Sequence, residues 1–282
     1  MLKIVYKLIF FLFGLLLGFA GFAQDGLEGI IVEKFYVSTK ADNAGKLYSG
    51  DLPEGSVTYR IYVDLKPGYR FQAAYGSPQH PLVIESTENF YNHLENGNIQ
   101  PNIIPERTYK KNIALLDSWL SAGACAEGHL GILKEYDDTI SDKFIGFEKG
   151  YFKGKRKSVP LYEVDGMKRS AVLPVPTFFQ MDFLSKVIGT TTSDKRIYSD
   201  NGAWAALGKG AVGADSLSTN CVLIAQLTTV GELSFELNLL IGAPNGSSQK
   251  YVARNPITEE REWTHPELIF NSNRKKNKSK KK

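Results

Sequence analysis

The segment KGYFKGKRKS, residues 149–158, holds the densest set of side chains suited to binding chemistry. Its cations flank two aromatic rings: Lys149, Lys153, Lys155, Arg156 and Lys157 surround Tyr151 and Phe152. Such a patch can hold phosphate, sulfate or uronate groups by charge while the rings pack against an apolar part of the ligand. A solvated loop whose lysines promote solubility has the same composition. The segment therefore predicts either a surface for anionic polymers or a solvated loop.

Arg60 and Tyr62 form a second candidate binding surface. In VTYRIYVDL one set of side chains, Tyr59, Ile61, Val63 and Leu65, alternates with another, Thr58, Arg60, Tyr62 and Asp64. Period-two alternation predicts a half-buried strand, so we expect the first set inward and the second outward. An exposed tyrosine beside an arginine can stack on a sugar, although any solvated strand face has the same pattern.

Calcium is the only cofactor for which the sequence offers candidates. Asp42, Asn43 and Asp51 share one Gly-containing loop, and a second loop holds Asp194, Asp200 and Asn201. Neither loop has EF-hand spacing, and turns favour Asp and Asn for their own reasons. We therefore keep the first loop as a calcium candidate, with an ordinary turn as the alternative.

Signatures of catalysis are missing from the sequence. The four histidines are isolated, and neither an HExxH nor a GxSxG motif occurs. A glycosidase needs only two carboxylates that meet in space, and the sequence does not choose a pair among 30 acidic residues. We expect no catalytic residue, and a polysaccharide-acting hydrolase or lyase is the alternative.

Short strands and turns rich in Gly, Pro and Asn dominate the remaining pattern. We predict an opening strand over residues 29–37, a hairpin over 57–76 around Lys66-Pro67-Gly68, and a second hairpin over 221–242 around Val230 and Gly231. Sustained helical periodicity is almost absent. The sequence therefore predicts an all-β fold, an antiparallel β-sandwich of jelly-roll or Ig-like type with long Gly/Asp-rich loops.

The domain plan follows from these elements. We predict one sandwich domain over residues 24–273. The two hairpins are of similar length and end in Gly76 and Gly242. This resemblance suggests two related halves, 24–133 and 160–273, joined by the basic loop; chance similarity is the alternative.

The first 23 residues have the layout of a secretory signal peptide. Lys3 and Lys7 precede an apolar run over residues 8–17, and small residues stand at Gly21 and Ala23. Cleavage near Ala23 predicts a secreted, periplasmic or cell-surface protein, with no transmembrane segment after cleavage. A membrane anchor is the alternative.

Charge is distributed unevenly along the chain. Seven of the last nine residues, 274–282, are basic, and two more basic residues lie in the signal peptide. Without these nine groups the chain holds 25 basic residues against 30 acidic ones. We therefore expect an acidic body and a disordered basic tail.

Cys125 and Cys221 are the only cysteines. An exported protein meets oxidising conditions, so one prediction is a disulfide that closes a long loop. Two buried free thiols are the alternative, because the sequence fixes the pairing but not its geometry.

Four segments together resemble a family of uncharacterised secreted proteins from Bacteroidetes-type bacteria: GLEGIIVEKFYVS, GSVTYRIYVDLKPGYRFQAAYG, DSWLSAGA and VLIAQLTTVGELSFELNLLIG. The resemblance covers most of residues 26–245 and implies export and a β-rich fold, with no assigned chemistry. Members of that group often end in a type IX secretion sorting domain. This chain departs from the pattern, because it ends in NSNRKKNKSKKK.

Taken together, these features predict a secreted, non-catalytic protein of the cell surface or matrix. Its expected partners are extracellular polysaccharide, lipopolysaccharide or a surface protein, without specific nucleic-acid recognition. A structural component of an extracellular assembly is a further alternative, which a long exposed strand edge or apolar patch would indicate.

Overall fold

A computed structural model describes residues 25–43, 50–109, 113–137, 151–152, 155–156, 159, 165–189 and 194–273. Within these residues most of the ordered backbone is antiparallel β-structure, which confirms the predicted all-β sandwich. No helix in the described ranges is long and apolar enough to cross a membrane. The predicted signal peptide and basic tail lie outside the described residues.

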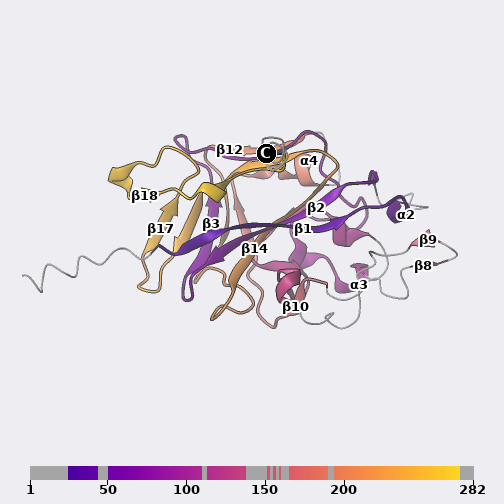
Figure 1. Ribbon diagram of the computed structural model, residues 1–282, viewed down its shortest axis with the longest axis horizontal. Helices are drawn as coiled ribbons and strands as arrows, with labels where there is room; N and C mark the ends of the chain where they lie inside the picture. The colour runs from indigo at the N-terminus through magenta and orange to yellow at the C-terminus, as the bar shows by residue number, and fades with distance from the viewer. Residues whose placement is uncertain are drawn as a thin grey trace, which may run out of the picture.

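One sheet, sheet A, runs through the middle of the molecule. Its strand order is β1 (Leu27–Val37), β2 (Val57–Leu65), β14 (Asn220–Thr229) and β5 (Trp119–Leu120). Figure 1 shows β1, β2 and β14 side by side across the centre of the view. The predicted opening strand is therefore confirmed as β1.

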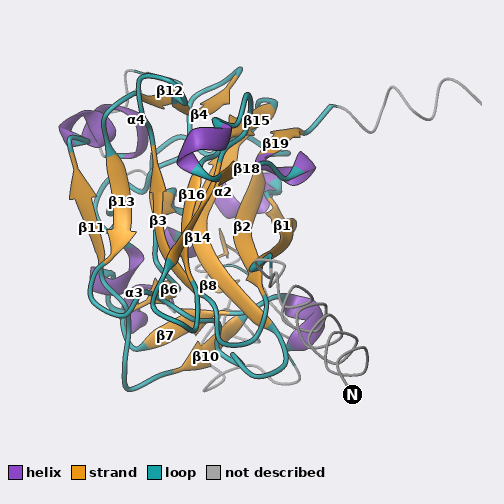
Figure 2. Ribbon diagram, turned by 90° about the vertical axis from the view of Figure 1, so that its left-hand side faces the viewer, coloured by secondary structure: helices purple, strands orange, loops and turns teal. Residues whose placement is uncertain are grey.

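Two further sheets cover one face of sheet A. Sheet B has the order β11 (Pro176–Phe179), β13 (Ala203–Ala206), β3 (Arg70–Tyr75), β16 (Leu239–Gly242), β17 (Ser248–Tyr251) and β18 (Glu262–Trp263). Sheet C has the order β12 (Arg196–Ser199), β4 (Leu82–Ser86), β15 (Leu233–Glu236) and β19 (Ile269–Asn271). Figure 2 shows sheet C across the top of the molecule.

A small sheet and some of the short helical turns cover the other face of sheet A, whereas other turns pack into the core between sheet A and sheets B and C. Sheet D has the order β10 (Met167–Arg169), β7 (His129–Gly131) and β6 (Ala124–Ala126), and β8 (Tyr151–Phe152) pairs with β9 (Lys155–Arg156). The α-helical turns are α2 (Lys40–Asn43), α3 (Glu106–Tyr109) and α4 (Ser185–Ile188). The 3-10 turns are η2 (Pro101–Ile103), η3 (Ala114–Leu116), η4 (Lys134–Tyr136), η6 (Asp182–Leu184), η7 (Thr258–Glu260) and η8 (Pro266–Leu268).

Sheet A therefore separates two buried cores. The inner core lies against sheets B and C and takes Tyr59, Ile61, Val63 and Leu65 from β2, as predicted. The outer core lies against sheet D and the helical turns and includes Tyr62, Tyr109, Trp119, Cys125, Met167 and Leu223. All ten residues of β14 are buried, because both of its faces are covered.

Both predicted hairpins are wrong in their pairing, although their strands exist. β2 belongs to sheet A and β3 to sheet B, so the turn at residues 66–69 carries the chain across the inner core. Likewise β14 belongs to sheet A, whereas β15 pairs with β4 and β19 in sheet C. An alternating segment interrupted by a glycine turn has the same pattern whether its strands pair or face each other across a core.

The two predicted halves do not form separate units. Sheet A combines β1 and β2 with β14, and sheet B places β3 between β13 and β16. Strands from both parts of the chain are hydrogen-bonded within one sheet, so neither half can bury its core alone.

Candidate functional site

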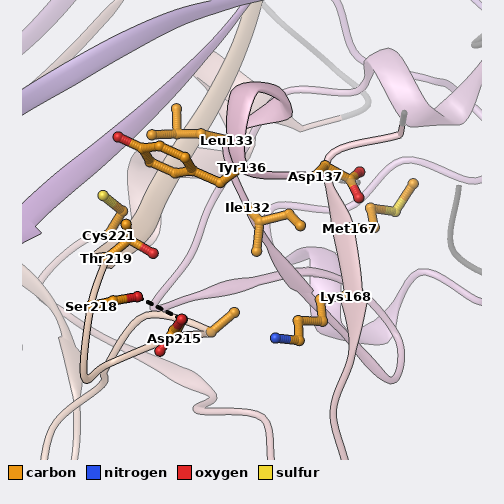
Figure 3. A pocket seen from close by; sticks show the side chains of 11 residues that line it. Ile132, Leu133, Tyr136, Asp137, Met167, Lys168, Asp215, Ser218, Thr219 and Cys221 are labelled. Atoms are coloured by element: carbon orange, nitrogen blue, oxygen red, sulfur yellow. Dashed lines mark hydrogen bonds between the residues drawn. The ribbon is translucent and has the colours of Figure 1, made fainter. Parts of the chain in front are cut away.

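A pocket of about 380 Å³ opens between the turn that follows β7 and the loop that precedes β14, as Figure 3 shows. We call it the Tyr136 pocket. Its lining consists of Ile132, Leu133, Tyr136, Asp137, Met167, Lys168, Ala214, Asp215, Ser218, Thr219 and Cys221. The volume lies within the range of roughly 300 to 1,000 Å³ that is typical of small-molecule sites.

One wall of the pocket presents an aromatic ring from a well-anchored turn. Tyr136 ends η4 and is 52% exposed. The backbone N–H of Lys134 donates to Glu33 Oε1 at 2.8 Å, and Lys134 Nζ donates to the Phe35 carbonyl at 2.6 Å. These bonds fasten η4 to the edge of β1, so the ring of Tyr136 is held at the pocket while much of it remains open to solvent.

The opposite stretch of lining contains a hydrogen-bonded carboxylate. The Ser218 hydroxyl donates to Asp215 Oδ2 at 2.6 Å, and the Thr219 backbone N–H donates to the Asp215 carbonyl at 2.9 Å. The hydroxyl bond is the main reason that the pKa of Asp215 lies below its ordinary value. Asp215 is therefore ionised at neutral pH and fixed in direction.

Asp137 supplies a second carboxylate to the lining. Asp137 Oδ2 accepts the backbone N–H of Gly166 at 2.8 Å and that of Asp165 at 3.2 Å. These bonds shape the turn before β10, which in turn brings Lys168 to the pocket. The ionisable side chains of the lining other than Tyr136 and Cys221 are thus two carboxyl groups, Asp137 and Asp215, and one amine, Lys168.

The cysteines are both free thiols buried in the outer core, which matches the alternative to the predicted disulfide. Cys221 lines the pocket, and its Sγ donates to Asp64 Oδ1 at 3.3 Å. Burial raises the pKa of Cys221 to about 12, with the Asp64 carboxylate as the next cause. The same burial effect raises the pKa of Cys125 to about 12. Neither thiol is therefore a nucleophile at neutral pH.

The prediction that Arg60 and Tyr62 are exposed is wrong. Both side chains are 0% exposed, because sheet D covers the face of β2 that the alternation assigns to solvent. Arg60 Nε donates to Gln226 Oε1 at 2.9 Å and Nη1 donates to the Gly166 carbonyl at 2.8 Å. The Tyr62 hydroxyl donates to the Ile132 carbonyl at 2.9 Å. The pair therefore stabilises the turns behind the Tyr136 pocket and offers no surface for stacking on a sugar.

The basic segment is described only in part. Tyr151 and Phe152 form β8, which pairs with Lys155 and Arg156 of β9. Lys149, Lys153 and Lys157 lie outside the described residues, as do the side chains of the four paired positions. Whether this segment binds anionic polymers stays a prediction.

The calcium candidate is not assembled by the described residues. Asp42 is fully buried, and its carboxylate accepts bonds from the Tyr36 hydroxyl and from the backbone N–H and hydroxyl of Thr39. Asp51 is exposed at the rim of a different pocket of about 270 Å³, and the side chain of Asn43 lies outside the described set. Asp42 therefore closes its own turn. Across the described residues no group of three His, Cys, Asp or Glu side chains is placed to hold a metal ion.

Apart from Cys221, a disulfide candidate, none of the residues that line the Tyr136 pocket is a candidate from the sequence alone. Tyr136 and Asp137 lie in a charged, irregular stretch, and the three segments of the lining are far apart along the chain. One local signal was available: an Asp followed three residues later by Ser, as in Asp215 and Ser218, favours a side-chain-capped turn.

No protein-family model matches the chain, and neither a curated protein nor a solved structure does. The ligand class of this protein is therefore inferred from the Tyr136 pocket and the residues behind it.

Proposed function

We propose that this protein is an exported, non-catalytic glycan-binding protein and that the Tyr136 pocket receives a sugar. The proposal combines the secretory pattern of the first 23 residues with one structural observation. That observation concerns the pocket lining, where the exposed ring of Tyr136 occurs together with the carboxyl groups of Asp215 and Asp137. Each carboxyl group is oriented by a hydrogen bond from a neighbouring residue.

The chemistry of the lining suits a hydroxyl-rich ligand. An aromatic ring offers a flat apolar surface to the C–H face of a pyranose, while a few placed polar groups orient its hydroxyls. Asp137 and Asp215 accept hydrogen bonds, Lys168 donates them, and Thr219 does both. Because the lining holds two carboxyl groups against one lysine, it favours neutral glycans over the anionic polymers expected from the basic segments.

The test is titration calorimetry with soluble cello-, xylo-, laminari- and N-acetylchito-oligosaccharides. We expect at least one of them to bind the wild type and Tyr136→Ala to weaken it about tenfold through loss of the ring contact. Tyr198→Ala is the matched control, since Tyr198 is 42% exposed on β12, away from the pocket lining, and should leave affinity unchanged. Failure of all four series to bind, or wild-type affinity in Tyr136→Ala, would overturn the proposal.

A hydrolase is the second candidate, because two carboxylates, Asp137 and Asp215, line the same pocket. Glycosidases use such a pair as acid and base or nucleophile. Release of new reducing ends from any oligosaccharide that binds, abolished in Asp215→Asn, would favour catalysis. Binding without release favours the non-catalytic role.

A further inference from the structure

Asp165 lies directly behind the wall of the Tyr136 pocket, and one of its oxygens is unsatisfied. The residue is 0% exposed, and Oδ1 accepts the backbone N–H of Met167 at 3.1 Å. Oδ2 is buried without a hydrogen-bond partner among the described residues. A buried, ionised carboxylate with an unpaired oxygen is strongly unfavourable, so this carboxyl group calls for a proton or a partner.

Asp137 is a neighbouring group that can take part in the missing bond. Its Oδ2 accepts the backbone N–H groups of both Asp165 and Gly166, and its side chain also interacts with that of Asp165, so the two carboxyl groups lie close together. Two carboxylates in such proximity do not both stay ionised, and they titrate as a pair. A proton on Asp165 would convert its unpartnered oxygen into a donor toward Asp137.

The other charges around the pair lead to the same conclusion. Among the described residues, Arg60 of β2 and Lys134 of η4 are the basic groups that act on it, and Glu33 of β1 is a further carboxyl group beside Lys134. Cys125 of β6 is also close but keeps its proton, since burial raises its pKa to about 12.

Before Asp165 is counted, the described residues around the pair supply two basic groups, Arg60 and Lys134, and two carboxyl groups, Glu33 and Asp137. Ionisation of Asp165 would add a further negative charge to this buried cluster.

We infer that Asp137 and Asp165 share a single proton, and that its loss adds a negative charge behind the Tyr136 pocket. The pocket would then select amine-bearing sugars over acidic ones, increasingly so as pH rises. The inference about ligand class rests on the proposed function. Burial, followed by the Asp137 charge, raises the pKa of Asp165 to about 7, which places the change near neutrality.

The probes are three oligosaccharides: the N-acetylated chito-oligosaccharide, its N,N,N-trimethylated amine counterpart, and an oligogalacturonate. The trimethylated sugar is permanently charged, so any titration between pH 5.5 and 8.5 belongs to the protein. We expect its affinity to rise about fivefold over this range, as one added charge at short range predicts, while that of the neutral sugar stays flat. The oligogalacturonate should bind weakest at every pH.

Two variants separate the pair from the pocket. Asp165→Asn mimics the protonated carboxyl and should abolish the pH dependence. Asp215→Asn removes a pocket charge outside the pair, so it should weaken the trimethylated sugar at every pH and leave the pH dependence in place. The ¹³C shift of the Asp165 carboxyl in wild type, which needs no ligand, should titrate near neutrality.

The outcomes are distinguishable. An Asp165 carboxyl that is fully ionised by pH 5 overturns the shared proton regardless of binding. Equal, pH-independent binding of all three sugars overturns the selectivity and leaves the proposed function intact. Failure of every sugar to bind, with the carboxyl shift titrating near neutrality, overturns the proposed function and the ligand selectivity together.

Discussion

The two faces of sheet A are equally buried but differ in chemistry. The central part of the inner face of β2 and β14 is mainly aliphatic, with Ile61, Val63 and Ile224 all 0% exposed, and the buried polar residues Asn220 and Thr229 lie at the two ends of β14. The outer face carries Arg60 and Gln226, also fully buried. Polarity along a strand therefore does not mean contact with water. On the outer face, the polar side chains belong to a second buried core. Their hydrogen bonds stabilise this core, which supports the Tyr136 pocket.

The largest expected effect comes from removing the cation of the outer face. Arg60→Ala leaves the Gln226 Oε1 and Gly166 carbonyl acceptors unpaired and the nearby carboxylates uncompensated, which should cost about 4 kcal/mol in the free energy of unfolding. Arg60→Met retains packing on the Phe35 ring, which lies 3.6 Å from the guanidinium carbon, and should lose less. Equal losses in chemical denaturation would mean that packing, not polar pairing, stabilises this face.

Stability should depend on pH through the outer face. Burial raises the pKa of Asp165 in the folded protein to about 7, whereas the unfolded chain has a pKa near 4. Between these two values the folded protein holds a proton that the unfolded chain has released. The free energy of unfolding of the wild type should therefore fall as pH rises from about 4 to about 7. The difference in unfolding free energy between Asp165→Asn and wild type should therefore grow in favour of the variant over this range, by at most about 4 kcal/mol. A constant difference from pH 4 to 8 would contradict the shared proton.

The inner face should respond to volume and not to pH. Ile61→Ala removes buried methyl groups where neighbours from sheets B and C cannot collapse fully, and should cost about 3 kcal/mol at every pH. Ile103→Ala is the matched control, since Ile103 is 56% exposed and should change stability by less than about 0.5 kcal/mol. If the loss of unfolding free energy in Ile61→Ala depended on pH, the proposed difference between the two faces would be wrong.

The smallest effect tests directional bonding at a single cross-strand pair. The hydroxyls of Thr58 and Thr228 lie 2.7 Å apart in the outer face. Thr228→Val strands the Thr58 hydroxyl and should cost about 1 to 2 kcal/mol, whereas the double valine variant should be nearly neutral. Additive losses in the double-mutant cycle would show that the two hydroxyls act independently.

Much of the local structure could be predicted from the sequence. Alternation correctly marked β2 as a strand and Tyr59 as a core residue, and glycine and proline marked the turn after Leu65. The pairing of strands could not be predicted, because β2 and β3 face each other across a core that alternation alone cannot distinguish from a hairpin. One neglected signal was the apolar run from Val222 to Ala225, which is typical of a strand buried on both faces.

The candidate site was less predictable than the fold. The basic segment is visible in the sequence because its charges are adjacent, whereas Tyr136, Lys168 and Asp215 come from separate stretches of the chain. The alternation places Arg60 on the solvent face of β2, where the structure buries it. Its partners Gln226 and Gly166 lie more than a hundred positions away, so only the folded chain reveals that a buried guanidinium is compensated there.

The sequence by itself determined the all-β class, the strand segments and the inward set of β2, because these follow from local alternation and turn chemistry. The tertiary structure alone decided that sheet A has two buried faces, that the cysteines stay apart as free thiols, and that Asp137 and Asp165 meet. Such features depend on which distant segments are brought together, and the energy of a buried charge or an unpaired oxygen exists only once those segments have excluded water.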